Sequence, residues 1–435
     1  MTWILLILLL ATFVYFSYRR PLLGLVGIIV LLPSYLWRIS LFGLPTTFLE
    51  LMIISLFIIW LIKDKKYSKI KFSFKKNLAN KLEPVIRILL FLWLAVSLIA
   101  LAVNPTQAAL GLWRAYWLEP MMFFLVFIYS VNSKQDLRII FKAAGVLVVG
   151  LFLITVYQYF TGWNLPSEYN WPNIRRSTAI FSYPNALSLL TAAFTAFFIG
   201  LWAAAKNKIK DFWCLIVFIF GLWMIFLAVS EGAMVAIGAS LFFWLILAKK
   251  IRKFGIPIIA AALLLIIFLL PVTQYFNNFK QQLFQPELNL QATSLEIRSS
   301  QWQETWSMLQ DNLIFGSGIY GYQDKMLNYH HYEWLEIYLY SHNIFLNFWA
   351  EIGLFGLIIF LAIMLYIVVV LRKLFIGKSE LAWPLTLMWL TWFVQGLVDV
   401  PYFKNDLSIL FFLFLGITLF AQEQLNIKES GLHKT

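Results

Sequence analysis

A histidine at the start of a long apolar run is the residue of this sequence best placed for acid–base chemistry. His342, followed by Asn343, lies where a polar loop enters the stretch SHNIFLNFWAEIGLFG. Imidazole is the side chain whose ordinary pKa lies near neutral pH, so a histidine held at a membrane surface can act as a base. The alternative interpretation is an interfacial histidine that only caps a helix.

If Asn343 opens a helix, a stripe of residues at helical spacing runs down from the histidine. Leu346, Trp349, Gly353 and Gly356 share this face, and the last two are glycines three residues apart. Glycines let a neighbouring helix approach closely, so we expect a second helix to pack here and to fix the top of the first.

Arginines in two upstream segments are suited to bind phosphate, because a guanidinium group stays charged and pairs with phosphate oxygens through a planar fork. One segment is Arg298-Ser-Ser-Gln-Trp302, which continues through Trp306 to the turn Phe315-Gly-Ser-Gly318. The other runs from Arg175-Arg176 to Pro184-Asn185, a pair that predicts a turn and the start of a helix.

Taken together, these patterns resemble the signature of the O-antigen ligase and O-antigen polymerase superfamily, membrane enzymes that move lipid-linked glycans. The similar pieces are the histidine–asparagine pair with its two glycines, the arginine–tryptophan segment with its glycine turn, and the arginine-to-Pro-Asn segment. They span roughly residues 170 to 360, and their order and spacing make the resemblance more specific than any single motif.

The resemblance implies transfer of a sugar from a polyprenyl diphosphate to an acceptor hydroxyl. Arg298 and either Arg175 or Arg176 would hold the departing diphosphate, and His342 would take the proton as general base. No metal or cofactor is expected, because arginines would stand in for a divalent ion and the outer side shows no convincing DxD pair. Further motif residues are expected to contact substrate (Asn343, Trp302) or to be structural (Pro184, Asn185, Gly316, Gly318, Gly353, Gly356).

One position departs from the family pattern. The family usually shows Ser-Arg-Gly where this sequence has Ser230-Glu231-Gly232. A carboxylate there would repel a diphosphate unless it is protonated or paired. Three interpretations are open: Glu231 pairs with Arg298 or Arg176, which we favour; it assists as a base; or the chemistry is altered or lost. Arg114 and Arg176 are the candidate replacements for the missing arginine.

Composition places the chain in a membrane. A mean hydropathy of +0.79, with 61% hydrophobic and 13% charged residues, describes more apolar surface than a soluble protein could bury. The single cysteine, Cys214, allows no disulfide and no thiolate metal site. The first apolar run lacks a basic start and a cleavage site, so we expect it to remain as a membrane anchor.

Thirteen apolar runs predict an all-α polytopic protein with 12 or 13 transmembrane helices and a large helical outer loop between the tenth and eleventh spans. The runs are about 2–18, 21–37, 44–62, 85–103, 113–131, 139–161, 185–205, 212–230, 232–248, 255–272, 343–371, 381–400 and 407–421.

The basic residues indicate the orientation. With residues 63–84 placed inside, 26 of the 34 Lys and Arg are cytoplasmic and 8 are outside, the bias that cytoplasmic loops show. Most of the formal charge of +13 therefore reflects topology, and nucleic acid is not an expected partner. We expect a multi-pass protein of the plasma membrane, with the arginine segments and His342 on its outer face.

We expect one integral membrane domain, residues 1–435, with a basic cytoplasmic loop (63–84) lying along anionic headgroups and a short cytoplasmic tail (422–435). The outer loops are 162–185 and 273–341. The larger one predicts helices at 295–309 and about 332–340. Its adjacent His330 and His331 are expected to be solvated rather than bound to a metal.

Four acidic residues inside apolar runs, Glu50, Glu119, Glu351 and Asp399, are costly in lipid and so invite a functional interpretation. We assign none of them a catalytic role, although Asp399 is close enough to the outer end of its run to support the catalytic loop. Glu351 is expected to pair with a neighbouring helix, because it lies on the face opposite His342.

The function that these observations favour is an O-antigen ligase-like glycosyltransferase. Its expected partners are a polyprenyl-diphosphate-linked glycan donor, a glycan or lipid acceptor and membrane lipids. A polysaccharide polymerase of the same superfamily is the alternative, because the sequence does not identify the acceptor. A multi-span solute transporter is the alternative from another class, but the paired repeats with broken helices typical of many transporters are not evident.

Overall fold

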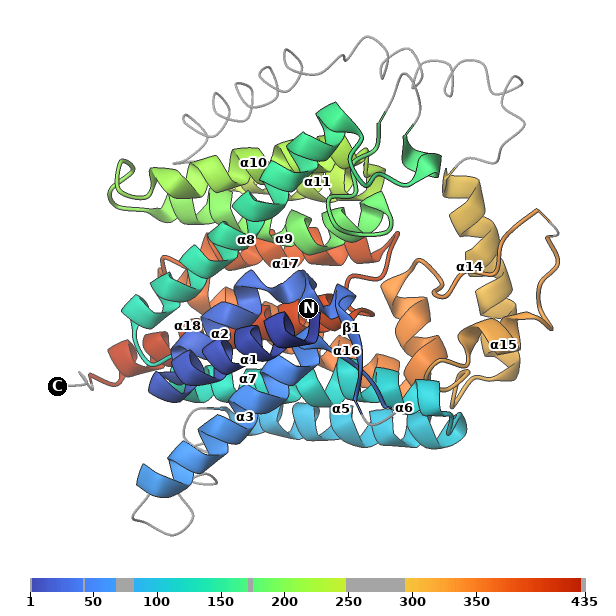
Figure 1. Cartoon of the computed structure of the whole chain (residues 1–435), viewed down its shortest axis with the longest axis horizontal. Coiled ribbons are helices and arrows are strands. Elements are labelled where there is room, and N and C mark those ends of the chain that lie inside the picture. Colours follow the sequence, from blue (N-terminus) through green and yellow to red (C-terminus); the bar gives the residue numbers. More distant parts are fainter. Residues whose placement is uncertain are drawn as a thin grey trace.

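Helices make up nearly all of the regular structure in the computed structural model, which describes residues 2–41, 44–67, 82–170, 175–247, 294–332 and 334–431 (Figure 1). Within this part, five helices are long and apolar enough to cross a membrane. They are α5 (Pro84–Val103), α8 (Lys134–Thr161), α9 (Pro184–Ala204), α16 (Ile344–Ile376) and α18 (Asn405–Glu429). The predicted all-α polytopic membrane fold is therefore confirmed.

The other elements are shorter or less apolar. They are α1 (Thr2–Arg19), α2 (Pro21–Val30), η1 (Leu32–Leu36), β1 (Arg38–Leu41), β2 (Leu44–Thr47), α3 (Phe48–Tyr67), α6 (Gln107–Trp113), η2 (Arg114–Leu118), α7 (Glu119–Ser130), η3 (Ser167–Tyr169), α10 (Phe212–Ala228), α11 (Glu231–Leu247), α14 (Ser294–Asp311), α15 (Tyr322–Met326) and α17 (Ala382–Gly396). Twelve of the thirteen expected apolar runs coincide with helices of this paragraph or the preceding one. The thirteenth, at 255–272, lies outside the described residues.

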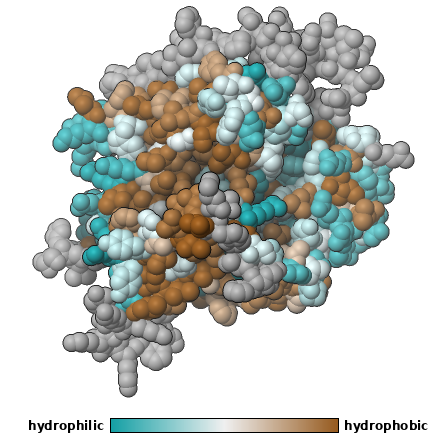
Figure 2. Space-filling model, viewed as in Figure 1, coloured by the Kyte–Doolittle hydropathy of each residue, from teal (hydrophilic) through white to brown (hydrophobic). Residues whose placement is uncertain are grey.

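Burial separates central helices from lipid-facing ones. In the apolar stretch of α18, 94% of the residues are buried, against 28% in α5. An apolar helix that stays this exposed in the folded chain needs another apolar medium around it, which for α5 is lipid. Figure 2 shows the same division on one face of the molecule: apolar side chains form a band between two more hydrophilic ends.

The helix α14 and the short α15 lie at one end of the bundle, beyond the ends of the long helices (Figure 1). This end, which also holds the start of α16, is called the site end below. The expected helix at 295–309 is confirmed by α14, whereas the one at about 332–340 is wrong. The described residues of that stretch form bends and turns, and their backbone groups bond to α14 side chains instead.

A break in α16 explains the glycines of two motifs. Ile352 and Gly353 have non-helical backbone angles, and the turn after α14 fills the gap. Ser317 N donates to Ala350 O (2.7 Å), and Leu354 N donates to Ile314 O (3.0 Å), so the backbone groups released by the break are satisfied. We expected a helix to pack against the glycine stripe; a turn packs there instead, because it brings the polar groups that a broken helix needs.

Short extended segments complete the site end. The strands β1 and β2 form an antiparallel hairpin in which Arg38 pairs with Thr47 and Leu41 pairs with Leu44. This hairpin leads directly into α3, whose first turn is closed by a capping box: Thr47 Oγ1 accepts from Glu50 N (3.2 Å), and Glu50 Oε2 accepts from Thr47 N (3.2 Å). The expected run at 44–62 therefore begins as a strand and becomes helical only at Phe48.

Candidate active site at the start of α16

The start of α16 is capped as the sequence predicts. Asn343 Oδ1 accepts from Phe345 N (3.0 Å) and Leu346 N (3.2 Å), which satisfies two of the free donors of the first turn. His342 lies just outside the helix in the left-handed region, with φ of 49°. Its side chain does not supply the cap, so the interpretation of His342 as only a helix cap is wrong.

The imidazole ring of His342 lies between an acid and an aromatic ring. Its Nδ1 is 3.4 Å from Asp399 Oδ1, longer than an ordinary hydrogen bond, and the ring packs edge-on against Tyr338 with centroids 5.2 Å apart. The His342 side chain is 26% exposed and that of Asp399 is 9% exposed. A carboxylate on the Nδ1 side favours the tautomer protonated there, which leaves Nε2 as the basic nitrogen.

The loop from Leu397 to Lys404, between α17 and α18, joins the separate motifs. Leu397 O accepts from Asn343 Nδ2 (3.0 Å), and Lys404 Nζ lies 4.2 Å from the centre of the Tyr183 ring, next to Pro184. Val398 packs against Gly232, where an added Cβ would lie 3.0 Å from its Cγ2. The sequence analysis named Asp399 as able to support the catalytic loop, but it did not identify this loop as the segment that joins the motifs. The available signals were an acid within an apolar run and a lysine just after that run.

The helix α14 is fastened to the backbone around His342. Trp302 Nε1 donates to His342 O (3.3 Å), and Gln301 Nε2 donates to Tyr340 O (2.5 Å). Arg298 is one turn before Trp302 on the same helix face, about 6 Å along the axis. Its Nη1 donates to Ser294 Oγ (2.7 Å) within the same helix. The helix therefore carries Arg298 at the site end, within one turn of a residue that contacts the histidine backbone.

The adjacent arginines of the upstream segment both bind helix ends. Arg175 Nη1 donates to Tyr159 O (2.8 Å) and Phe160 O (2.7 Å) at the end of α8. Arg176 donates from Nε to Ala228 O (3.3 Å), at the last residue of α10, and from Nη2 to Val229 O (3.1 Å), at the next residue. Cations at the carboxyl ends of helices are stabilising there. Much of the donor capacity of both guanidinium groups is therefore used within the protein.

The Pro184-Asn185 segment contacts the Ser230-Glu231-Gly232 segment, which differs from the family pattern. Pro184 begins α9, and Ser230 Oγ donates to Asn185 Oδ1 (3.3 Å). Glu231 begins α11 and is exposed, where a carboxylate interacts favourably with the helix N-terminus. Among the described residues it forms no ion pair, so the pairing with Arg298 or Arg176 that we favoured is absent.

The histidine pair His330–His331 and Glu351 also have partners that differ from those we expected. His330 is not simply solvated: its Nδ1 lies 3.3 Å from Glu304 Oε2, on α14. The same carboxylate accepts from His331 N (2.7 Å), so Glu304 holds this loop against the helix. Glu351 accepts from Tyr320 N (2.9 Å) in the turn that fills the break of α16, rather than from a neighbouring helix.

Comparisons with known proteins agree with the motif pattern. Residues 216–361 match a family model described as O-Antigen ligase, a range that includes Glu231, Arg298 and His342. The chain is also 23% identical over 270 residues to the teichuronic acid biosynthesis protein TuaE of Bacillus subtilis (strain 168). That alignment covers 60% of this chain and 55% of the relative, so the chain spans about half the length of the curated protein it matches.

Proposed function

This chain carries an O-antigen ligase domain and belongs to the O-antigen ligase and polymerase superfamily, and we propose that it is a glycosyltransferase. It moves a glycan from a polyprenyl diphosphate to an acceptor hydroxyl at the outer face of the plasma membrane. The observation that carries the proposal is the contact between His342 and Asp399 beside the helix that bears Arg298. The excess of Lys and Arg in the expected cytoplasmic loops supports the outer face as the location of this end.

In the proposed reaction the acceptor oxygen forms a bond to the anomeric carbon as the bond from that carbon to the diphosphate oxygen breaks. The electron pair leaves with the diphosphate, and the hydroxyl proton passes to His342 Nε2. Asp399, next to Nδ1, orients the ring and stabilises the imidazolium that forms. Catalytic hydrogen bonds are often long in the absence of substrate and tighten when it binds, so the 3.4 Å distance between Nδ1 and Oδ1 is compatible with this role.

Arg298 is the proposed ligand of the departing diphosphate. Arg298 donates to one side-chain hydroxyl, that of Ser294, whereas Arg175 and Arg176 each donate to two backbone carbonyls. A guanidinium aimed at an oxygen that gains charge is effective in a site from which water is partly excluded. The helix position of Arg298, fixed through Trp302, would keep the cation in place before the reaction begins.

We expect Arg298→Ala to lower glycan transfer by about 10²-fold, because one donor to the developing negative charge is lost. Arg298→Lys should recover only part of this loss, since an ammonium group lacks the planar fork. The measurement is transfer by purified protein in detergent, with the lipid-linked glycan extracted from a strain that lacks this protein. Lys206→Ala is the control, because Lys206 is an exposed partner of Glu380 outside the motifs. Equal activity of Arg298→Ala and Lys206→Ala would exclude Arg298 as the diphosphate ligand.

Deletion of the gene separates ligase from polymerase. A ligase should leave long glycans on the lipid carrier that never reach their acceptor, whereas a polymerase should leave single lipid-linked units and no long chains. Gel analysis of surface and lipid-linked glycans distinguishes these outcomes. Covalent transfer in detergent also tests the transporter alternative, because a carrier needs two compartments and forms no new glycosidic bond. Unchanged glycans in the deletion strain, with no transfer in detergent, would overturn the proposed function.

A further inference from the structure

A π-helical turn, η2 (Arg114–Leu118), interrupts the helix formed by α6 and α7 at the site end. Its cause lies in the sequence: Pro120 has no N–H, so the carbonyls of Ala115 and Tyr116 lose the donor that a π-helix or an α-helix would supply. Hydroxyl groups from another segment donate to these two carbonyls instead. Tyr402 Oη donates to Tyr116 O (2.5 Å), and Ser408 Oγ donates to Ala115 O (3.3 Å).

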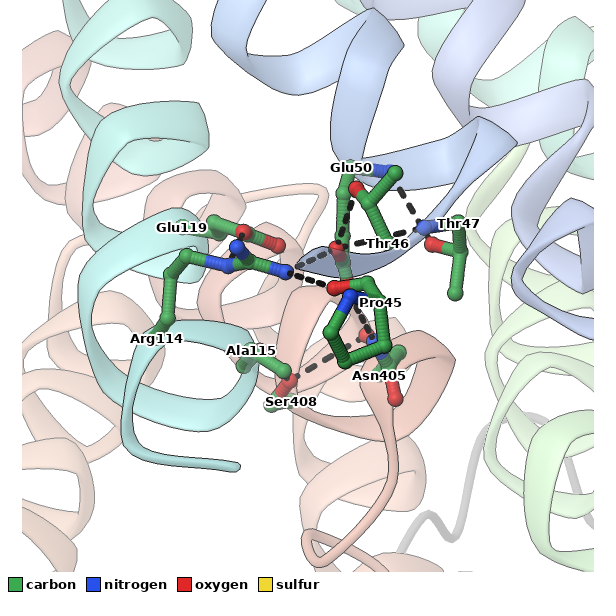
Figure 3. Close-up of polar contacts among 9 residues, drawn as sticks. All are labelled: Pro45, Thr46, Thr47, Glu50, Arg114, Ala115, Glu119, Asn405 and Ser408. Carbon is green, nitrogen blue, oxygen red and sulfur yellow. Dashed lines mark hydrogen bonds and ion pairs between the residues drawn. The ribbon is translucent and has the colours of Figure 1, made fainter. Parts of the chain in front are cut away.

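The turn is anchored by a buried charge network (Figure 3). The Arg114 guanidinium binds Glu50, and its Nε lies 2.9 Å from Glu119 Oε1. Both glutamates are buried, with exposures of 4% and 1%, and a buried carboxylate is costly unless a cation compensates it. Glu50 Oε1 also accepts from Asn405 Nδ2 (3.0 Å), at the first residue of α18. Because two carboxylates already surround this guanidinium, Arg114 is poorly suited to replace the missing diphosphate arginine.

The anchored turn contacts both segments that carry the proposed acid–base pair. Tyr116 Oη lies 3.0 Å from Tyr340 Oη, two residues before His342. Tyr402, which donates to the Tyr116 carbonyl, is three residues after Asp399. The two members of the pair come from segments 57 residues apart in the chain, and η2 is bonded to each segment close to its functional residue.

We propose that Arg114 is a positioning residue, which holds the π-helical turn so that Tyr116 and Tyr402 set the distance between His342 and Asp399. Arg114 does not touch the reacting atoms in this arrangement. It fixes the turn, the turn fixes the two tyrosines, and these fix the segments on either side of the imidazole. The inference rests on the proposed function, because it assigns a role to a distance that matters only if His342 transfers a proton.

Tyr402→Phe is the sharpest test, because it removes one hydroxyl and keeps the buried ring. We expect kcat for transfer of the extracted lipid-linked glycan to fall by about 10- to 100-fold with KM nearly unchanged, since misplacement of an acid–base pair affects the transition state. Arg114→Lys should act in the same direction, since an ammonium group cannot contact Glu50 and Glu119 as a guanidinium does. Tyr366→Phe is the matched control: this buried tyrosine has its hydroxyl within hydrogen-bond distance of Glu83 and Gln422, far along α16 from the site.

A second measurement needs no substrate. Diethyl pyrocarbonate modifies exposed imidazole nitrogens, and peptide mass spectrometry can follow His342 separately from His330. We expect the modification rate of His342 to rise severalfold in Tyr402→Phe and in Arg114→Lys, and to stay unchanged in Tyr366→Phe. The rate at His330 should not change in any variant, because Glu304 holds that residue independently of η2. Tyr116→Phe, which removes the bond to Tyr340, replaces Tyr402→Phe if the latter does not fold.

The inference is overturned if the His342 modification rate and kcat of Tyr402→Phe match those of the protein without substitutions. It is also overturned if Tyr366→Phe lowers kcat as much as Tyr402→Phe does. A fall in kcat without a change at His342 also overturns it, because the effect would then bypass the pair. Failure of the proposed function has a different signature: either the unaltered protein shows no transfer in detergent, or removal of His342 leaves transfer intact, whatever the modification rates show.

Discussion

Replacing His342 with asparagine should lower glycan transfer by about 10²- to 10⁴-fold, while folded protein accumulates at its usual level. The loss follows from removing the proposed general base. The fold should tolerate the change because the cap of α16 comes from Asn343, and the polar and ring contacts of the His342 ring with other described residues are those with Asp399 and Tyr338. Asparagine is preferred to alanine as the replacement because residue 342 has φ of 49°, a region that asparagine adopts more readily.

The matched control is His331→Asn, which changes an exposed histidine of the segment between α15 and α16 whose backbone, rather than ring, binds Glu304. Full activity is expected there. Asp399→Asn should reduce transfer less than His342→Asn, since it removes the group that orients the ring and leaves the base in place. Transfer is measured on purified protein, with thermal unfolding as the check on folding. Activity of His342→Asn within a few fold of the control would remove the histidine from the mechanism and leave the proposed chemistry without a base.

The helices could be predicted from the sequence because a segment that crosses lipid has few stable backbone conformations. An apolar run of about 20 residues must satisfy its own backbone groups, so runs read from hydropathy become helices almost regardless of their neighbours. The helix start at Asn343 was predictable for the same local reason, since the cap depends on residues within one turn. The contacts that these helices make with segments distant in the sequence could not be predicted from local residues.

Contacts between distant segments escaped the sequence analysis. Nothing local to Asp399 reveals that its carboxylate lies beside His342, and nothing local to Arg176 reveals that its guanidinium binds carbonyls at the end of α10. The arginine pattern indicated cations suited to phosphate, but a helix end supplies a competing set of acceptors that only the fold places nearby. For Glu231 we favoured pairing with Arg298 or Arg176, whereas its carboxylate lies exposed at a helix N-terminus. The π-helical turn, by contrast, has a local signal in the sequence, because Pro120 lacks the N–H that a regular helix needs.

Replacing Gly316 with alanine should destabilise the protein strongly, since the residue has φ of 62° and a Cβ there would lie 2.3 Å from Ala350 O and 2.4 Å from Trp349 O. The left-handed conformation alone costs about 1–2 kcal/mol for an alanine. The clash adds to this, because backbone carbonyls of a packed helix cannot move aside as a flexible side chain can. The turn that fills the break of α16 would be displaced, and Ser317 and Ile314 would lose their bonds to the broken helix.

Gly150→Ala, in α8, is the matched control for this glycine change. An added Cβ at Gly150 meets nothing within 4 Å, and alanine is favoured over glycine inside a helix by about 1 kcal/mol. We therefore expect the unfolding temperature in detergent to fall, or the protein to be lost from the membrane, for Gly316→Ala, and to hold or rise for Gly150→Ala. Because the displaced turn follows directly on α14, which carries Arg298 and Trp302, whatever Gly316→Ala protein still folds should also transfer glycan more slowly. Equal stability of the two variants would mean that the turn does not occupy the break in α16, and the placement of α14, which leads into this turn, would lose one of its supports.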